Sequence, residues 1–133
     1  MSAELVTYAL LSAHAPLAAL VQARIFPGHL ERGANTPAVI YELVSATPAP
    51  AIDAWAATHL TRSRVTVSAI AADYATTKAI RDAVSAAMRN QRGTFGGVET
   101  HAILLDRDQP MTFEDETELW HRPIDFVILH QQA

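Results

Sequence analysis

Histidine is the residue type in this chain best suited to hold a metal ion or move a proton, and there are six of them. No two stand at the HxH or HxxxH spacing that places two imidazoles on one face of a strand or helix, and HExxH is absent. The chain has no cysteine, so thiolate metal sites and disulfides are excluded. We therefore predict no metal centre, and interpret as surface or packed core residues His14, His29, His59, His101, His121 and His130.

Glycine and serine motifs for nucleotide binding or hydrolysis are also missing. Gly28 to Gly33 has the glycine spacing of a phosphate loop, but Ala34 and Asn35 stand where lysine and Ser/Thr are required. The glycines at 93, 96 and 97 miss the dinucleotide pattern, and no GxSxG elbow is present. These absences predict a protein that is not an enzyme, with no catalytic residues and no cofactor.

Acidic residues gather near the C-terminus, in what we call the acidic segment, residues 106–118. It lacks the glycine and the alternating acids of a calcium loop. It contains a single cation, Arg107, and six carboxylates, which belong to Asp106, Asp108, Glu114, Asp115, Glu116 and Glu118. The segment is either a solvated loop or a charged contact surface.

A helix is predicted from a cap at Asp73 to about Asn90, and its polar face is basic. At about 100° per residue, four cations fall within an arc of roughly 80° opposite the apolar residues. We call these the basic stripe: Lys78, Arg81, Arg89 and Arg92. Lys78 is also placed to pair with Asp82 four residues later. The stripe is either a solvated face or a docking face for an acidic partner.

The stretch from Ala46 to Leu60 separates two predicted strands and is long for a hairpin loop. Trp55 sits in it among alanines, and tryptophan is enriched at interface hot spots. Trp55 either packs on its own core or anchors a partner.

The predicted elements alternate in a simple way. An N-terminal helix, interrupted at Pro16, buries Leu5, Val6, Ala9, Leu10 and Ala13. Strands are expected at 38–45, 62–71, 98–107 and 119–130, with the helix from Asp73 between the second and third. The residues 124–129 are apolar on both faces except Asp125, which is typical of a central or partner-covered strand.

This order predicts an α+β fold with a four-stranded, mainly antiparallel sheet of two hairpins packed by two helices, in the order α-β-β-α-β-β. The 133 residues predict a single domain over 1–133. A net charge of −4 argues against a nucleic-acid-binding surface, and no segment reaches the ~18 apolar residues of a membrane span. The N-terminus lacks the basic start of a secretory signal, so we expect synthesis in the cytoplasm.

In their order along the chain, these segments resemble the tail-completion, or tail-terminator, proteins of long-tailed phages. The resemblance rests on residues 24–27 (RIFP), 37–41 (PAVIY), Asp53, 64–67 (RVTV) with Ala71, 80–87, and 122–128 (RPIDFVI). It covers most of the chain, and the ordered set carries it rather than any one motif. The alanine-rich loop with Trp55 departs from the pattern, so its contacts are the least transferable.

The resemblance implies a structural virion protein. Such proteins form a ring, typically a hexamer, that caps the last ring of the tail tube and offers a surface to the head connector. It implies a place at the head-proximal end of the tail, assembly in the host cytoplasm, and DNA passing through the ring without sequence-specific binding. Phage, prophage and gene-transfer-agent sources all remain open. The residues at the ring's interfaces are expected among Asp53, Trp55, the basic stripe and residues 114–118 of the acidic segment.

Two other interpretations compete with this one. The first is that the chain is another tail or connector component, which would also be a structural protein without a catalytic site. A small-molecule-binding α+β domain would need a pocket with convergent polar groups, and the sequence offers no such set.

Overall fold

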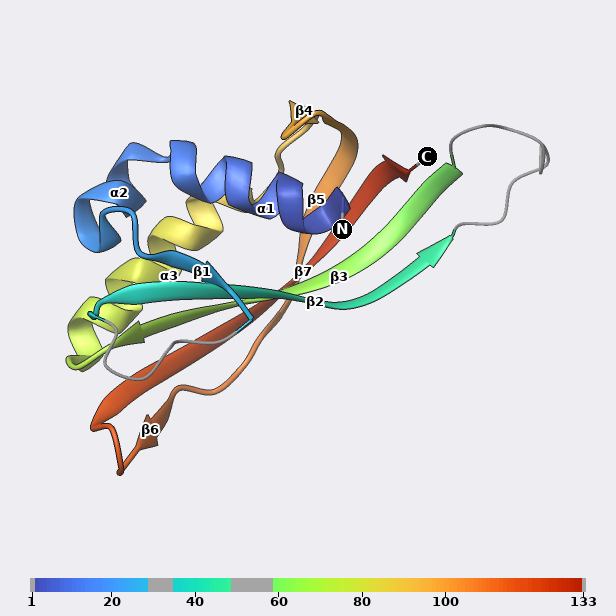
Figure 1. Cartoon of the computed structure of the whole chain (residues 1–133). Helices are drawn as coiled ribbons and strands as arrows, with labels where there is room; N and C mark the ends of the chain where they lie inside the picture. The colour runs from blue at the N-terminus through green and yellow to red at the C-terminus, as the bar shows by residue number, and fades with distance from the viewer. Residues whose placement is uncertain (1, 29–34, 49–58, 133) are drawn as a thin grey trace.

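The computed structural model describes residues 2–28, 35–48 and 59–132. The helices are α1 (Ser2–Ala13), α2 (Ala15–Val21) and α3 (Tyr74–Met88). The strands are β1 (Ile25–Pro27), β2 (Ala38–Pro48), β3 (His59–Ala71), β4 (Gly93–Phe95), β5 (Val98–Asp108), β6 (Thr112–Glu114) and β7 (Leu119–Gln132). Figure 1 shows the helices gathered on one face of a strongly twisted and curved sheet.

The sheet has seven strands in the order β1-β2-β3-β7-β5-β4, with β6 also paired to β7. Strand β1 runs parallel to β2, and the other pairs are antiparallel. The C-terminal strand β7 lies between β3 and β5, so the last residues of the chain form the middle of the sheet (Figure 1). The apolar run at 124–129 belongs to this central strand, as its composition predicts.

The prediction of a four-stranded antiparallel sheet with two helices is wrong: residues 2–28, 35–48 and 59–132 form a seven-stranded mixed sheet and three helices. The missed strands β1, β4 and β6 have three residues each, too few to show an alternating pattern. Strand β1 forms because β2 offers it an edge, with the Val39 amide donating to the Arg24 carbonyl at 2.9 Å. Pro16 makes α2 a helix of its own rather than an extension of α1.

Strand β4 owes its existence to Gly96 and Gly97, which turn the chain back onto β5. Both glycines have positive φ, 58° and 79°, and they connect Phe95 to Val98 as a two-residue hairpin loop. Positive φ at both central residues is the geometry of the tight turns that join antiparallel strands. A Cβ on Gly96 would lie 2.8 Å from the carbonyl oxygen of Leu5, so this hairpin also packs closely on α1.

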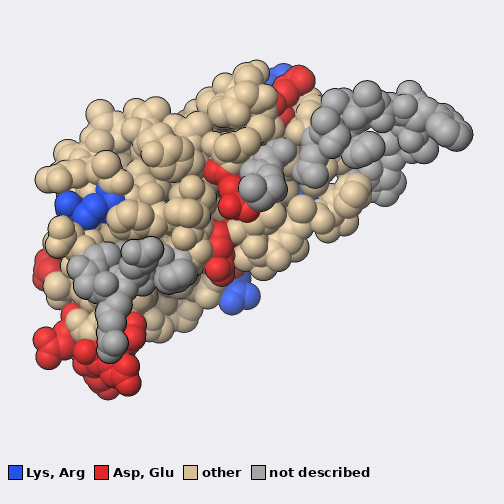
Figure 2. All heavy atoms as spheres, in the orientation of Figure 1, with Lys and Arg blue, Asp and Glu red and all other residues tan. Residues whose placement is uncertain are grey.

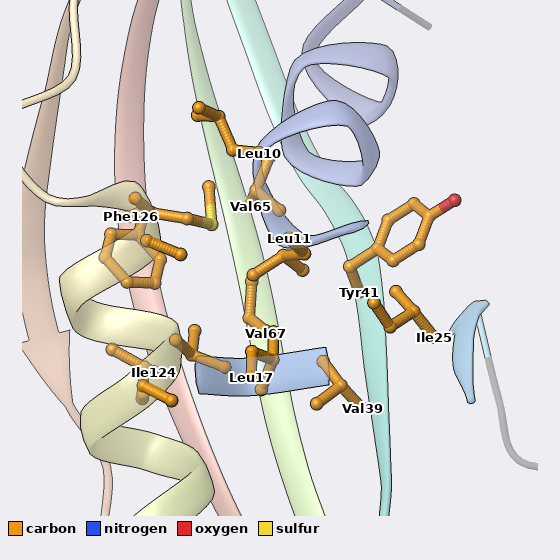
Figure 3. Close-up of a cluster of buried hydrophobic side chains, with 14 of the residues drawn as sticks. Leu10, Leu11, Leu17, Ile25, Val39, Tyr41, Val65, Val67, Ile124 and Phe126 are labelled. Carbon is orange, nitrogen blue, oxygen red and sulfur yellow. The ribbon is translucent and has the colours of Figure 1, made fainter. Parts of the chain in front are cut away.

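The hydrophobic core fills the space between the helices and the sheet (Figure 3). From the helices come Leu11 and Leu17, and from the sheet Val67 and Phe126, all fully buried. Alternate residues of β3 face the core, because Val65, Val67, Ala69 and Ala71 are buried. The predicted apolar stripe of α3 is buried as well: Ile80, Ala83, Val84, Ala87 and Met88. Asp73 caps α3 as predicted, its carboxylate accepting from the Thr76 amide at 3.2 Å.

Helix α1 buries a face that only partly matches the predicted one. Val6 and Leu10 are buried as predicted, but Leu5 is 53% exposed, while Leu11 and Thr7 are fully buried. Thr7 is compatible with the core because its hydroxyl donates to the Ala3 carbonyl at 2.8 Å, which leaves no unpaired polar atom. With Thr7 counted as an inward residue, the buried face has regular helical spacing: Ala3, Val6, Thr7, Leu10 and Leu11.

No single helix within the described ranges has the length and apolar character to cross a membrane. Helices α1 and α2 pass that test only when taken together, and they are bent by 83° at the break between them.

Candidate functional site: charged and aromatic surfaces

The structure divides the basic stripe into two parts. Helix α3 ends at Met88, Arg89 has the extended backbone of a helix cap, and Asn90 follows with φ of 60°. Arg89 and Arg92 therefore lie beyond the helix, where helical spacing no longer sets their direction. Lys78 and Arg81 remain on the helix itself.

Arg81 is engaged inside the chain rather than held out for a partner. Its Nε donates to the Asp108 carboxylate at 3.0 Å, and a second guanidinium nitrogen contacts the other oxygen of the same carboxylate. This two-point pairing is the strong form of an arginine–carboxylate contact. The hydrogen bond that Arg81 donates to Asp108 raises the pKa of Arg81 and lowers the pKa of Asp108. Asp82 contacts Arg81 at 3.2 Å, so it is Arg81 and not Lys78 that the structure shows paired with Asp82.

The acidic segment is also divided. Its first part belongs to β5, where Asp106 pairs with Arg64 and Asp108 with Arg81 and, at 3.7 Å, Arg122. These carboxylates hold the chain's own elements together. The last part, the turn between β6 and β7, is exposed and gives the red end of the molecule at the lower left of Figure 2. In that turn Glu114 contacts His121 at 3.1 Å. No ion pair within the described ranges involves Asp115, Glu116 or Glu118.

An aromatic cluster that the sequence does not predict lies at the base of that turn. The Trp120 ring lies 5.2 Å from Tyr74 at the start of α3 and 4.9 Å from Phe113 of β6. Tyr74 is 51% and Phe113 45% exposed, which is high for large apolar side chains. The only signal in the sequence is that Trp120 is the second of two tryptophans. Nothing local shows that residues 74, 113 and 120 meet.

A shallow pocket of about 300 Å³ lies next to the cluster, between α3 and β7. It contains Lys78, the exposed cation on the helical part of the stripe, and its walls are Tyr74, Lys78, Arg81, Asp82 and Arg122. The Nε of Arg122 is buried there and has no hydrogen-bond partner among the described residues. The pocket walls carry three cations and one carboxylate, but Arg81 and Arg122 both contact Asp108 of the same chain, which leaves little net positive charge for an anionic group.

Two of the predicted interface residues, Asp53 and Trp55, lie outside the described residues. The ends of the predicted 46–60 loop are strands, because β2 continues to Pro48 and β3 begins at His59. The interval between the strands is therefore residues 49–58.

A carboxylate and a histidine are buried within the sheet, at Asp125 and His130, and both have hydrogen-bond partners. Asp125 accepts from the Thr66 hydroxyl at 2.7 Å and the Gln109 amide at 3.0 Å. The fully buried His130 lies 2.8 Å from the Ser63 hydroxyl and 3.1 Å from the Gln131 carbonyl. Burial lowers the pKa of His130. A serine–histidine contact with no exposed face serves packing rather than catalysis, since a substrate could not reach it. No group of three metal-binding side chains occurs within the described ranges.

The described surface presents exposed aromatic and charged side chains that are suited to contacts with other proteins. The fold is shared with a chain of a solved virion of a native gene transfer agent particle. That chain is 22% identical, the TM-score is 0.74, and the match covers 99% of the present chain and 95% of the other. No curated protein matches in sequence. The family described as tail completion protein gp17 matches residues 7–131, and the chain belongs to that family. It is accordingly a structural component of a phage-type tail.

Proposed function

We propose that the protein forms a ring that ends the tail tube and provides the surface to which the head is joined. The observation that carries the proposal is the match of the tail completion family to residues 7–131, nearly the whole chain. A part that completes a tail must stop further addition of tube subunits and present a new surface on its other side. A closed ring of one subunit height does both.

The surfaces of the described residues support a ring. Closed rings use contacts in which one patch meets a different patch on the neighbour. The exposed acidic turn and the exposed arginines beyond α3 are two such unlike patches. We take the ring to have six copies, with the tail tube protein on one side and a head connector protein on the other. DNA passes through it without sequence-specific contacts, and the protein has no catalytic role.

Deletion of the gene tests this proposal. Particles that lack the protein should have tails of uneven, excessive length that are not attached to heads, and supplying the protein should restore joined particles. Electron microscopy of particles carrying a labelled copy should place the label between tail and head. A label at the distal end, or attached tails of normal length without the protein, would show that the chain is a different tail component.

The copy number is tested separately by native mass spectrometry of the assembled protein. A single species of six copies is the expected result. A protein that stays monomeric at assembly concentrations and in particles would contradict the ring.

A further inference from the structure

A second pocket, of about 190 Å³, lies beyond the C-terminal end of α3 and against β5. This is several times the ~30 Å³ that one water molecule takes up in the liquid. The Asn90 amide, which donates to the Ile103 carbonyl at 3.0 Å, fixes the chain after α3 onto this strand. We call the pocket the socket, and its walls are Asn90, Gln91, Arg92, His101, Ala102, Ile103 and Leu104.

The socket has an apolar wall and a basic rim. Leu104 is 51% exposed, although it lies on a strand next to the centre of the sheet. Arg92 lines the socket, and Arg89 directly precedes its first lining residue, Asn90. Both arginines are exposed, and no ion pair with either is found in the ranges that the structure describes. The nearby carboxylate on β5 is Glu99, and the ring of His101 contacts Gln131 at 3.0 Å. Counting both arginines and Glu99, the rim has more positive than negative charge.

The turn at the other end of the sheet has the opposite character. We call residues 112–118 the tip. Phe113, 45% exposed, is its apolar part, and its four carboxylates come from Glu114, Asp115, Glu116 and Glu118. The tip thus presents an aromatic ring beside negative charge, and the socket presents an exposed leucine beside positive charge.

The tip and the socket of one chain cannot touch. Phe113 pairs with Trp120 and Ile103 pairs with Ile128, so eight residues of β7 separate them. At about 3.3 Å per strand residue, this is about 26 Å. Any contact between these two surfaces must join different molecules.

We infer that the tip of one copy enters the socket of the next, and that this contact repeats around the ring. The inference rests on the proposed ring and names its subunit contact. Phe113 covers Leu104, which removes two exposed apolar side chains from water, while the tip carboxylates lie opposite Arg89 and Arg92. An apolar centre with a charged rim is the usual anatomy of a protein interface, and aromatic side chains often supply its affinity.

A second copy is the occupant that fits best because both halves are on the same chain. The charges are complementary, and the two patches differ, as closure of a ring requires. Lys78 and Arg81 are left out of the contact. Arg81 is held by Asp108, and both residues stand on the first half of α3, close to the aromatic cluster and not to the socket.

Cross-linking between cysteines tests the contact directly, because the chain has no cysteine of its own. Thr117→Cys in the tip and Gln91→Cys in the socket replace neutral residues and leave the charges intact. Within one chain these positions are too far apart for a disulfide, whose Cα atoms lie within about 7 Å. Oxidation of the assembled double variant should give a ladder of covalent oligomers that ends at the ring's copy number. As a matched control, Thr117→Cys with Ser12→Cys, an exposed position on α1, should give no ladder.

The outcomes separate this inference from the proposed function. Rings that form without a ladder contradict the contact and leave the ring standing. Dimers from Thr117→Cys alone also contradict it, because they would show that the tip meets another tip. If the unsubstituted protein gives no rings, the proposed function fails and the contact fails with it.

Charge reversal provides a second test. Arg89→Glu with Arg92→Glu should slow ring assembly at low salt by about tenfold, since complementary charge mainly sets the rate of association. Adding Glu114→Lys and Glu116→Lys should restore the rate. Lys78→Glu reverses a positive charge that lies outside the socket. It is the control and should leave assembly unchanged. Equal slowing by Lys78→Glu, or no rescue by the tip lysines, would overturn the contact.

Discussion

The arginines at the two ends of α3 differ in whether they are paired within their own chain. At the first half, Arg81 is bound by Asp108, a carboxylate of its own chain, and the adjacent ring of Trp120 is packed against Tyr74. Beyond the last turn, Arg89 and Arg92 are exposed. All three arginines belong to one stripe by helical spacing, but the helix ends before the last two.

This difference separates residues that stabilise the subunit from residues that are available for assembly. A charge or ring satisfied within the chain lowers the free energy of the folded state, so changing it should reduce stability. A side chain that faces solvent contributes little to folding, so changing it should affect only association. The variants below compare side chains that are satisfied within the chain with side chains that are more exposed to solvent.

The largest effect is expected at Trp120. Its ring is partly buried between Tyr74 and Phe113 and joins α3 to the β6–β7 hairpin. Trp120→Ala should lower the free energy of unfolding by about 2 kcal/mol, somewhat less than for a fully buried tryptophan. Phe113→Ala, at an exposed position, should cost less than about 1 kcal/mol. Urea denaturation of both variants measures the difference, and equal losses would contradict the division between the two roles.

A smaller effect is expected at Arg81. Arg81→Met removes the cation and leaves Asp108 with only the longer contact to Arg122, at 3.7 Å. We expect a loss of about 1–2 kcal/mol, because hydrogen bonds to charged groups are strong but this pair is partly exposed to solvent. Arg89→Met should change stability by less than about 0.5 kcal/mol. If the two variants unfold at the same urea concentration, Arg81 has no special role in the subunit.

Much of the core could be predicted from periodicity, and the exceptions have local causes. The inward face of β3 and the apolar stripe of α3 follow directly from alternation and helical spacing. The face of α1 was misassigned because Thr7 bonds its own backbone and so behaves as an apolar residue. Strands of three residues carry no periodicity, and β1 depends on pairing with residues of β2 that lie fourteen positions away in sequence.

The candidate surfaces were harder to predict, because a charge pattern does not show which charges are already paired. Arg81 and Asp108 are twenty-seven residues apart, and the packing of α3 on β3 and β7, with β5 beside β7, brings them together. The aromatic cluster joins residues from three elements for the same reason. The family resemblance, by contrast, was carried by the order of segments and did not depend on these contacts.

The smallest effect is expected at His130, whose side chain is fully buried within the sheet. Its surroundings suit a neutral ring, with Nδ1–H donating to the Gln131 carbonyl and Nε2 accepting from the Ser63 hydroxyl. A proton on Nε2 would turn this acceptor into a donor in a site closed to water. Burial accordingly lowers the pKa of His130 below its ordinary value of 6.5.

The sign of the pH effect follows from linkage. Above pH 6.5 the ring is neutral in both the folded and the unfolded chain, so stability is independent of this group. Below that pH the unfolded chain binds the proton more readily, and stability falls as the pH drops toward the folded pKa. The loss at pH 5.5 should be up to about 1 kcal/mol, since one pKa unit corresponds to about 1.4 kcal/mol.

His130→Gln should be less stable than the unsubstituted protein at pH 7.5, and the difference in free energy of unfolding between the two proteins should narrow at pH 5.5. His14→Gln, at a partly exposed position, is the control and should keep the full pH dependence. A gap for His130→Gln that stays constant between pH 7.5 and 5.5 would show that the buried imidazole does not take part in acid destabilisation.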